Sequence, residues 1–286
     1  MHSSAHYRQL LARLPQIAVA ADQFQVLNSA KDFKSRILSL IANATQRIYL
    51  IALYLQDDEA GREILSALYA AKQRNPALDI KVFVDFHRAQ RGLIGKGKQG
   101  GNHLMYQAMA ARHEHQIEIY GVPVKGRELL GVLHLKGFIF DDILLYSGAS
   151  LNDIYLHQQE RYRFDRYHQI HSQALTRSMV NYVDDVFLKS EAVQRLDRTG
   201  IPGAKQLKGQ IRRFKHNLRT SQYRFESIPA NSQEIAITPM VGLGKRGNQL
   251  NRMIRNLVRA TEREIFICTP YFNPPKELNK DVEALL

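Results

Sequence analysis

The chain has 286 residues, of which 44% are hydrophobic and 23% charged, as in soluble globular proteins. Its apolar runs are far shorter than the roughly 20 residues that a membrane-spanning helix needs, and the N-terminal residues lack the pattern of a signal peptide. The single cysteine, Cys268, argues against a disulfide framework and fits a reducing cytoplasm. The net charge of +13 predicts an acidic partner, either nucleic acid or an anionic membrane surface.

Helices and strands are predicted to alternate from the N-terminus. Apolar residues at helical spacing indicate helices at 5–21, 32–44 and 63–74, and apolar runs indicate strands at 48–55 and 80–85. A basic, glycine-rich loop at 87–101 carries Arg88 and Arg91. Further elements are expected as a helix at 104–112, strands at 116–120, 131–142, 143–147 and 161–170, and a helix at 176–188. This order predicts an α/β fold with a mixed sheet flanked by helices.

The segment 131–142 combines a buried strand pattern with charged side chains. His134 and Lys136 are two residues apart, so on a strand both would point to the same face. Burial of an unpaired charge is costly, and an anionic substrate is one reason to place these groups together. The alternative is a histidine at a strand end with a lysine that reaches solvent.

Residues 198–225 contain eight Lys or Arg and no Asp or Glu. Leu207, Ile211, Phe214 and Leu218 fall at helical spacing among these cations, which predicts a basic amphipathic helix. Three interpretations remain open for this helix: a solvated linker, an anchor on an anionic membrane, or a contact with the ribosome or nucleic acid. Six such cations would contribute about 1 kcal/mol each at an anionic bilayer.

An internal repeat links the two ends of the chain. Residues 44–54, ATQRIYLIALY, are echoed by residues 260–271, ATEREIFICTPY, and an amphipathic helix precedes each copy. The repeat divides the chain into a first half at 1–190, a basic linker at 191–232 and the start of a second half at 233–286.

Several motifs together resemble one family. His134-x-Lys136-x4-Asp141 followed by Gly148-Ala-Ser-Leu-Asn152 is similar to the H-x-K-x4-D motif of the phospholipase D superfamily. The family usually has Gly-Ser-x-Asn at the turn, one residue shorter than here. The match narrows to the bacterial phosphatidylserine synthases of this superfamily through the stretches at 84–95, 120–123, 145–153, 162–168, 241–245 and 268–273.

The resemblance implies that CDP-diacylglycerol and L-serine are converted into phosphatidylserine and CMP, without cofactor or metal. Two H-x-K motifs then share one site, where one histidine forms a phosphohistidine and the other acts as acid and base. Carried over, His134 is one of this pair and Lys136 binds phosphate. Asp141 belongs to the catalytic motif, with a mostly structural role. In the same way Asn152 and Asp165 support the site, and Arg88 and Arg91 meet substrate phosphates.

The second H-x-K motif is missing from this sequence. A fragment, an interrupted reading frame or a homodimer would each account for this, and the abrupt end of the second repeat favours the first two. The alternative functions are a homodimeric phosphodiesterase or nuclease of the same superfamily, and a non-catalytic remnant that binds membranes or RNA. The expected location is the cytoplasm, peripherally on the inner membrane surface.

Overall fold

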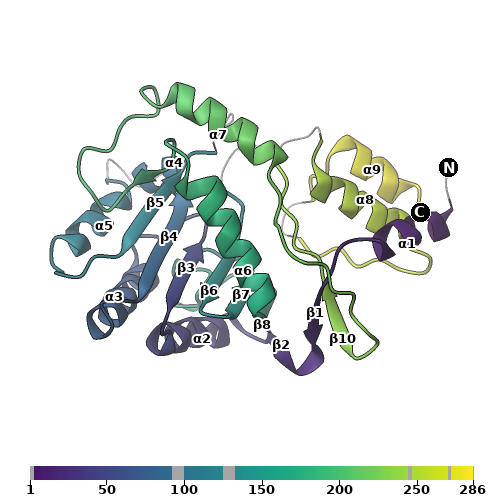
Figure 1. Cartoon of the computed structure of the whole chain (residues 1–286), viewed down its shortest axis with the longest axis horizontal. Helices are drawn as coiled ribbons and strands as arrows, with labels where there is room; N and C mark the ends of the chain where they lie inside the picture. Colours follow the sequence, from purple (N-terminus) through teal and green to yellow (C-terminus); the bar gives the residue numbers. More distant parts are fainter. Residues whose placement is uncertain (1–2, 92–99, 125–132, 244–246, 270–271, 286) are drawn as a thin grey trace.

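A computed structural model describes residues 3–91, 100–124, 133–243, 247–269 and 272–285. An eight-stranded sheet with helices on both faces forms the main body (Figure 1). The strand order is β2-β8-β7-β6-β3-β4-β5-β9. The expected mixed α/β sheet flanked by helices is therefore confirmed.

The central strands β3, β4 and β5 run parallel, and the other pairs in the sheet are antiparallel. Apolar and β-branched residues fill these strands, as expected for a sheet covered on both sides. The bounds are β2 (Phe24–Leu27), β3 (Arg47–Ile51), β4 (Asp79–Asp85), β5 (Glu118–Val122), β6 (Gly137–Phe140), β7 (Ile143–Tyr146), β8 (Tyr167–His171) and β9 (Gln194–Arg195).

One face of the sheet is covered by α2 (Ala30–Asn43), α3 (Glu59–Arg74) and α5 (His103–Ala110). The sequence signals the ends of these helices. Ser29 caps α2 by accepting from the Asp32 amide, and Asp58 caps α3 by accepting from the Gly61 amide at 2.9 Å. The α3 helix ends just before Pro76, where helical geometry is disfavoured.

The opposite face is covered by α6 (Gln173–Tyr182), the π-helix η2 (Val183–Leu188) and α7 (Lys208–Thr220). Phe83 of β4, Phe187 of η2 and Phe214 of α7 form a row of aromatic contacts in this layer. The predicted basic helix is therefore present and buries its apolar side here. Two short helices complete the main body, η1 (Ala21–Gln23) and α4 (Phe86–Gln90).

A smaller group of elements joins the two ends of the chain. The strand β1 (Ile17–Ala20) pairs antiparallel with β10 (Glu234–Ile237), and α1 (Ser4–Ala12) lies beside α8 (Gln249–Ala260) and α9 (Lys276–Glu283) (Figure 1). The predicted helix at 5–21 is wrong beyond Ala12, because Pro15 interrupts it and Ile17–Ala20 pairs as a strand instead. The domain division at residues 190 and 232 stays a prediction.

Several predicted strands are shorter than expected, and the second copy of the repeat does not form a strand at the described residues 264–269. The strand predicted at 48–55 ends at Ile51, and the strand predicted at 161–170 begins at Tyr167. Of the strand predicted at 131–142, residues 131–132 lie outside the described residues, and the remainder forms a strand only from Gly137. Residues 264–269, the second copy of β3, are not in a strand, and Phe266 is 92% exposed. The first copy forms a strand because β4 and β6 pair with it on both sides. Residues 264–269 have no corresponding neighbours within the described part of the chain.

Candidate active site

Five chain segments meet at one edge of the sheet. β3 and β4 end there, as does β7, whereas β6 and β8 begin there, because Ile51 lies opposite Gly137 and Tyr146 lies opposite His168. We call this the site edge. It collects the segment before β6 with His134 and Lys136, the turn after β7 with Asn152, and Asp165 just before β8. In open α/β sheets ligands bind outside the carboxyl ends of the parallel strands, which here point to the site edge.

His134 lies exposed on the extended segment that precedes β6, between buried Leu133 and half-buried Leu135. Surrounding protein atoms lower the pKa of His134, the positive charge of Lys136 lowers it further, and Asp85 acts in the opposite direction. A lowered pKa leaves the imidazole neutral at pH 7, when its nitrogen lone pair can act as nucleophile or base.

Lys136 is buried, with 8% of its surface exposed. Burial lowers its pKa to about 8, and the charge of Asp165 partly opposes this shift. The lysine remains mostly protonated at pH 7, so it can neutralise an anionic oxygen in a site of low dielectric constant. Lys136 lies two residues after His134 in the segment before β6, and Asp165 lies just before β8 at the same edge, so a shared role for these residues stays a prediction.

Asp165 approaches the turn after β7 closely because that turn has a glycine. A Cβ built on Gly148 would stand 2.7 Å from the Asp165 Oδ2 atom. The Asp165 carboxylate also accepts from the Arg166 amide at 2.7 Å, and its own amide donates to the Tyr167 hydroxyl at 3.2 Å. These contacts fix Asp165 at the site edge, and glycine at position 148 leaves room for its carboxylate.

Asp85 is a site-edge residue whose role the sequence analysis missed. Its carboxylate is fully buried at the end of β4 and accepts from three backbone amides: Leu133 at 3.0 Å, His87 at 3.0 Å and Arg88 at 2.9 Å. The Asp85 carboxylate therefore caps the N-terminus of α4 and also fixes the backbone of Leu133, the residue before His134. The available signal was a carboxylate at the end of the apolar run 80–84, where a parallel strand ends.

Arg88 and Arg91 follow Asp85 on the α4 segment. The charge of Arg88 contributes to the lowered pKa of His134, and its predicted contact with a substrate phosphate stays a prediction. Its Nε atom is buried and has no hydrogen-bond partner among the described residues. Arg91 is exposed at the end of α4. The rest of the basic loop, 92–99, lies outside the described residues.

Asn152 orders the turn after β7. Its Oδ1 atom accepts from the Tyr155 amide at 3.0 Å, the pattern of an Asx turn. The next residue, Asp153, accepts from the Ala60 amide at 2.8 Å and donates its own amide to Asp58 at 3.0 Å. This reciprocal pairing holds the turn against the start of α3. Burial, and then the Asp153 carboxylate, raise the pKa of Asp58 to about 6, although two backbone amides oppose this shift.

Asp141 is not brought together with His134. It follows β6, so the length of that strand, about 13 Å, separates it from the site edge. Its carboxylate accepts from the amides of Thr45, Gln46 and Arg47 at 2.8–2.9 Å and from the Thr45 hydroxyl at 3.0 Å. Burial disfavours the charge, but these donors outweigh it and hold the pKa of Asp141 below its usual value. This arrangement suits a structural role.

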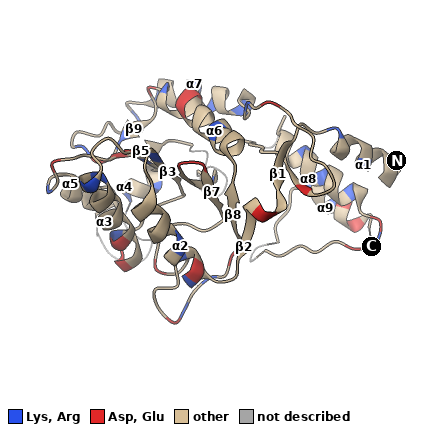
Figure 2. Cartoon of the chain, turned by 60° about the horizontal axis from the view of Figure 1, so that its bottom comes forward, with Lys and Arg blue, Asp and Glu red and all other residues tan. Residues whose placement is uncertain are grey.

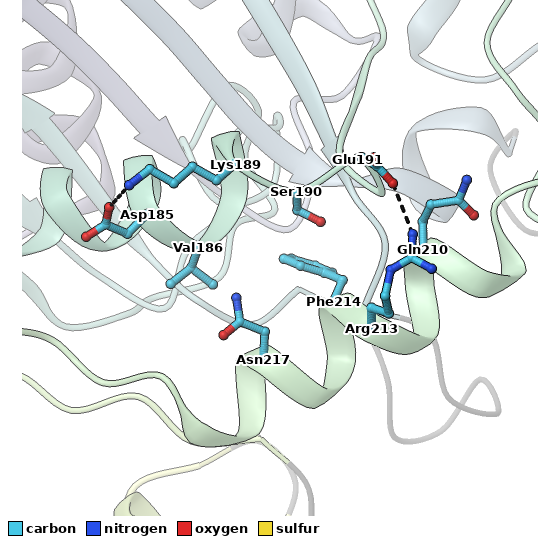
Figure 3. A pocket seen from close by; sticks show the side chains of 9 residues that line it. All are labelled: Asp185, Val186, Lys189, Ser190, Glu191, Gln210, Arg213, Phe214 and Asn217. Atoms are coloured by element: carbon cyan, nitrogen blue, oxygen red, sulfur yellow. Dashed lines mark hydrogen bonds and ion pairs between the residues drawn. The ribbon is translucent and has the colours of Figure 1, made fainter.

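A cavity of about 320 Å³ lies elsewhere, between η2 and α7 (Figure 3). The residues that line it include the ion pairs Arg213–Glu191 at 3.0 Å and Lys189–Asp185 at 2.5 Å, together with Phe214. None of its lining residues belongs to the site edge. Within the described ranges, we find no group of three His, Cys, Asp or Glu side chains placed to hold a metal ion.

The comparisons with known proteins agree with this geometry. Residues 37–160 match the family model described as cardiolipin synthase, PLD-like domain. The chain is 44% identical to the CDP-diacylglycerol–serine O-phosphatidyltransferase of Haemophilus influenzae over 97% of its own length, and 44% identical to that of Escherichia coli over 98%. It spans 62% of the length of each of these relatives.

The structural comparison gives the same result. The crystal structure of phosphatidylserine synthase from Haemophilus influenzae superposes with a TM-score of 0.90 at 42% identity, covering all of this chain and 64% of that one. The mixed sheet, the H-x-K segment at its edge and these matches make the chain similar to the bacterial CDP-diacylglycerol–serine O-phosphatidyltransferases and, over residues 37–160, to the PLD-like domain.

Proposed function

We propose that the chain provides half of a phosphoryl-transfer site that moves a phosphatidyl group from CDP-diacylglycerol to L-serine. The names of the two relatives at 44% identity support this reaction. The observation that carries it is the pairing of His134, whose pKa is lowered, with buried Lys136 at the site edge. The other half of the site would be a second H-x-K motif, which this sequence does not contain.

The proposed reaction has two steps. In the first, one histidine nitrogen attacks the phosphorus next to diacylglycerol, the P–O bond to CMP breaks, and a phosphatidyl-histidine forms. In the second, the serine hydroxyl loses its proton to the other histidine and attacks the same phosphorus, which releases the first histidine and phosphatidylserine. His134 would act either as the histidine that attacks phosphorus or as the histidine that accepts the proton. Lys136 would stabilise the charge that develops on the non-bridging oxygens.

The reaction is tested by measuring CMP release from CDP-diacylglycerol with and without L-serine. The assay uses this chain alone and a version extended with the part that the Haemophilus influenzae relative has beyond the matched region. We expect serine-dependent CMP release from the extended protein and its loss in His134→Ala. The control His171→Ala changes an exposed histidine at the opposite edge and should leave the rate unchanged. Release that persists in His134→Ala would show that the assignment of this histidine is wrong.

We further propose that α7 holds the protein on an anionic membrane. No helix in the described ranges is long and apolar enough to cross a bilayer. The α7 helix lies at the same end of the sheet as α4, which follows β4 at the site edge (Figure 1). Basic residues lie along α7 (Figure 2), where Lys208, Arg212, Lys215 and Arg219 recur every three or four residues and so share one face of the helix, whereas Phe214 and Leu218 are buried.

Four cations near an anionic bilayer would contribute about 4 kcal/mol in total, enough for reversible binding close to a lipid substrate. Co-sedimentation with vesicles that contain anionic lipid measures this binding. Replacement of the four α7 cations by glutamine should release the protein from these vesicles. The matched control replaces four exposed cations on other elements: Lys31, Arg112, Arg161 and Arg177. Equal loss in both variants would indicate a general charge effect and refute the role of α7.

A further inference from the structure

We propose that the cavity between η2 and α7 binds a small zwitterion of the amino-acid class, a molecule that carries one ammonium and one carboxylate group. We call it the η2–α7 cavity. It lies apart from the site edge, so the inference goes beyond the proposed transfer reaction and does not depend on it. The bound molecule would bridge α7 to the main body.

The two walls of the η2–α7 cavity are held together by aromatic packing. The cavity has a volume of about 320 Å³, at the lower end of the range for small-molecule sites. One wall is η2 with the turn that follows it, and the other is α7. The rings of Phe187 and Phe214 are both buried and meet edge-on at 6.0 Å, which fixes the distance between the walls. A π-helix such as η2 is rare and is often found at functional sites.

The α7 wall is polar where a helix packed for stability alone would be apolar. Gln210, Arg213, Phe214 and Asn217 line the cavity at positions i, i+3, i+4 and i+7, which form one stripe of the helix. Phe214 is the one apolar side chain among these four. The neighbouring stripe, with Phe214 and Leu218, is buried in the main body. The polar stripe therefore faces η2 across open space and is available to a ligand.

Two ion pairs stand on opposite sides of the η2–α7 cavity (Figure 3). Lys189 pairs with Asp185 at 2.5 Å on one side, and Arg213 pairs with Glu191 at 3.0 Å on the other. These four side chains are 40–76% exposed, and exposed ion pairs contribute little to stability, so a ligand can exchange into them at small cost. A ligand ammonium can then pair with either carboxylate while its own carboxylate pairs with either cation.

Neutral hydrogen-bonding groups lie between the two ion pairs. Ser190 and Asn217 both line this middle part of the cavity (Figure 3). The Ser190 hydroxyl accepts from the Ala192 amide at 3.3 Å, so its own hydrogen can be donated to a ligand. The Asn217 Oδ1 atom accepts from the Ser221 hydroxyl at 3.1 Å, which orients the side-chain amide. A hydroxyl and an amide suit a ligand that is polar along its whole length.

The balance of charge selects the class of ligand. The lining has two carboxylates and two cations, whereas a nucleotide would need an excess of cations and an acyl chain would need an apolar wall. A zwitterionic lipid headgroup has similar charges, but its approach is unfavourable. At 3.6 residues per turn, positions 210, 213 and 217 lie on the opposite side of α7 from the four cations that are proposed to meet the membrane. The ligand therefore comes from solution.

Calorimetry on the 286-residue chain tests this inference, with L-serine as the probe. Ethanolamine offers the ammonium alone, glycolate offers the carboxylate alone, and glycerophosphoethanolamine represents a zwitterionic lipid headgroup. We expect L-serine to bind at least tenfold more tightly than ethanolamine or glycolate, because each of these makes only one of the two charged contacts. Hydrogen exchange of the α7 amides should slow when L-serine is bound, since the ligand bridges α7 to η2.

Three variants locate the binding. Arg213→Gln and Asp185→Asn should each weaken L-serine binding about tenfold by removing one charged partner. Asn217→Trp fills the cavity without removing a charge and should abolish binding. The matched control is Arg62→Gln, which breaks an exposed ion pair with Asp57 on α3 and should leave the affinity unchanged. Thermal unfolding of each variant shows that the fold is kept.

The inference is overturned if L-serine binds the wild type no more tightly than ethanolamine and glycolate, if the folded cavity variants keep the wild-type affinity, or if glycerophosphoethanolamine binds more tightly. Lys136→Met separates the cavity from the site edge. Serine binding that is lost in Lys136→Met and kept in Arg213→Gln would place the amino acid at the site edge and refute the cavity alone. Binding in the cavity without serine-dependent CMP release by the extended protein would refute the transfer reaction alone.

Discussion

Replacement of Asp85 by asparagine should both destabilise the protein and change the titration of His134. The Asp85 carboxylate has no exposed surface, and its two oxygens accept from three backbone amides. An asparagine can keep one oxygen on the His87 and Arg88 amides. Its NH₂ group would then face the Leu133 amide, so two donors would meet where a donor and an acceptor now lie 3.0 Å apart.

The expected cost follows from this single exchange. One buried, charge-assisted hydrogen bond is lost and the Leu133 N–H is left without an acceptor, which together destabilise the fold by about 2–3 kcal/mol. With a urea m-value of about 3 kcal/mol/M, the unfolding midpoint should fall by about 1 M. The pKa of His134 should also fall further below its usual value, because the variant lacks the negative charge of Asp85 that partly opposes the lowering.

Three measurements test this prediction: urea unfolding, hydrogen exchange at the Leu133 amide, and an NMR titration of the His134 ring. We expect a lower midpoint, faster exchange at Leu133 and a lower His134 pKa. The control Asp22→Asn changes an exposed carboxylate in η1 and should alter none of these values. The reasoning is refuted if Asp85→Asn leaves the midpoint and the Leu133 exchange rate unchanged, or if the His134 pKa rises.

Three further predictions concern other parts of the site edge and the opposite edge. Gly148→Ala should cost about 1–3 kcal/mol in urea unfolding, because its Cβ would displace the Asp165 carboxylate, whereas Gly203→Ala, with nothing closer than 3.5 Å, should be nearly neutral. The pKa of Asp58 is about 6 in the folded chain, against 3.8 in the unfolded chain. Its contribution to the free energy of unfolding is therefore fully present below pH 3.8 and is lost as the pH rises to about 6. Thermal unfolding measured across this range should show this loss in the wild type and not in Asp58→Asn. Asp141→Ala should lower the free energy of unfolding by about 2–4 kcal/mol through its four lost hydrogen bonds, yet leave serine-dependent CMP release by the extended protein unchanged, and slower release by a folded variant would argue against its structural role.

The sequence was sufficient to predict the alternation of helices and strands, because apolar spacing and helix ends are local signals. The α3 helix illustrates this, since Asp58 and Pro76 mark its two ends. Of the predicted site residues, His134, Lys136 and Asp165 lie at the site edge and Asp141 lies at the other end of β6, and their catalytic roles stay predictions. The strand β8 begins two residues after Asp165 rather than before it.

The failures concern residues whose state depends on distant partners. The second repeat has the same strand pattern as β3, but in the first copy β4 and β6 satisfy the backbone, and no pattern within residues 264–269 reveals whether such neighbours exist. Asp85 was missed because its role depends on the Leu133 amide, 48 residues further along the chain. Residues 133–136, just before β6, are not paired in the sheet, and Gly137, at φ 145°, permits the backbone to change direction where β6 begins.

The pairing of β1 with β10 has a consequence for the order in which the chain folds as it is synthesised. The eight-stranded sheet is complete once β9 has emerged at Arg195, whereas β1 has no ladder partner until β10 has been made, about 40 residues later. At about 5–20 residues per second this delay lasts roughly 2–8 s. During that interval Ile17 and Val19, which are buried in the finished protein, remain available to other chains. Slow translation between residues 195 and 237 should therefore increase aggregation, and faster translation of this segment should reduce it.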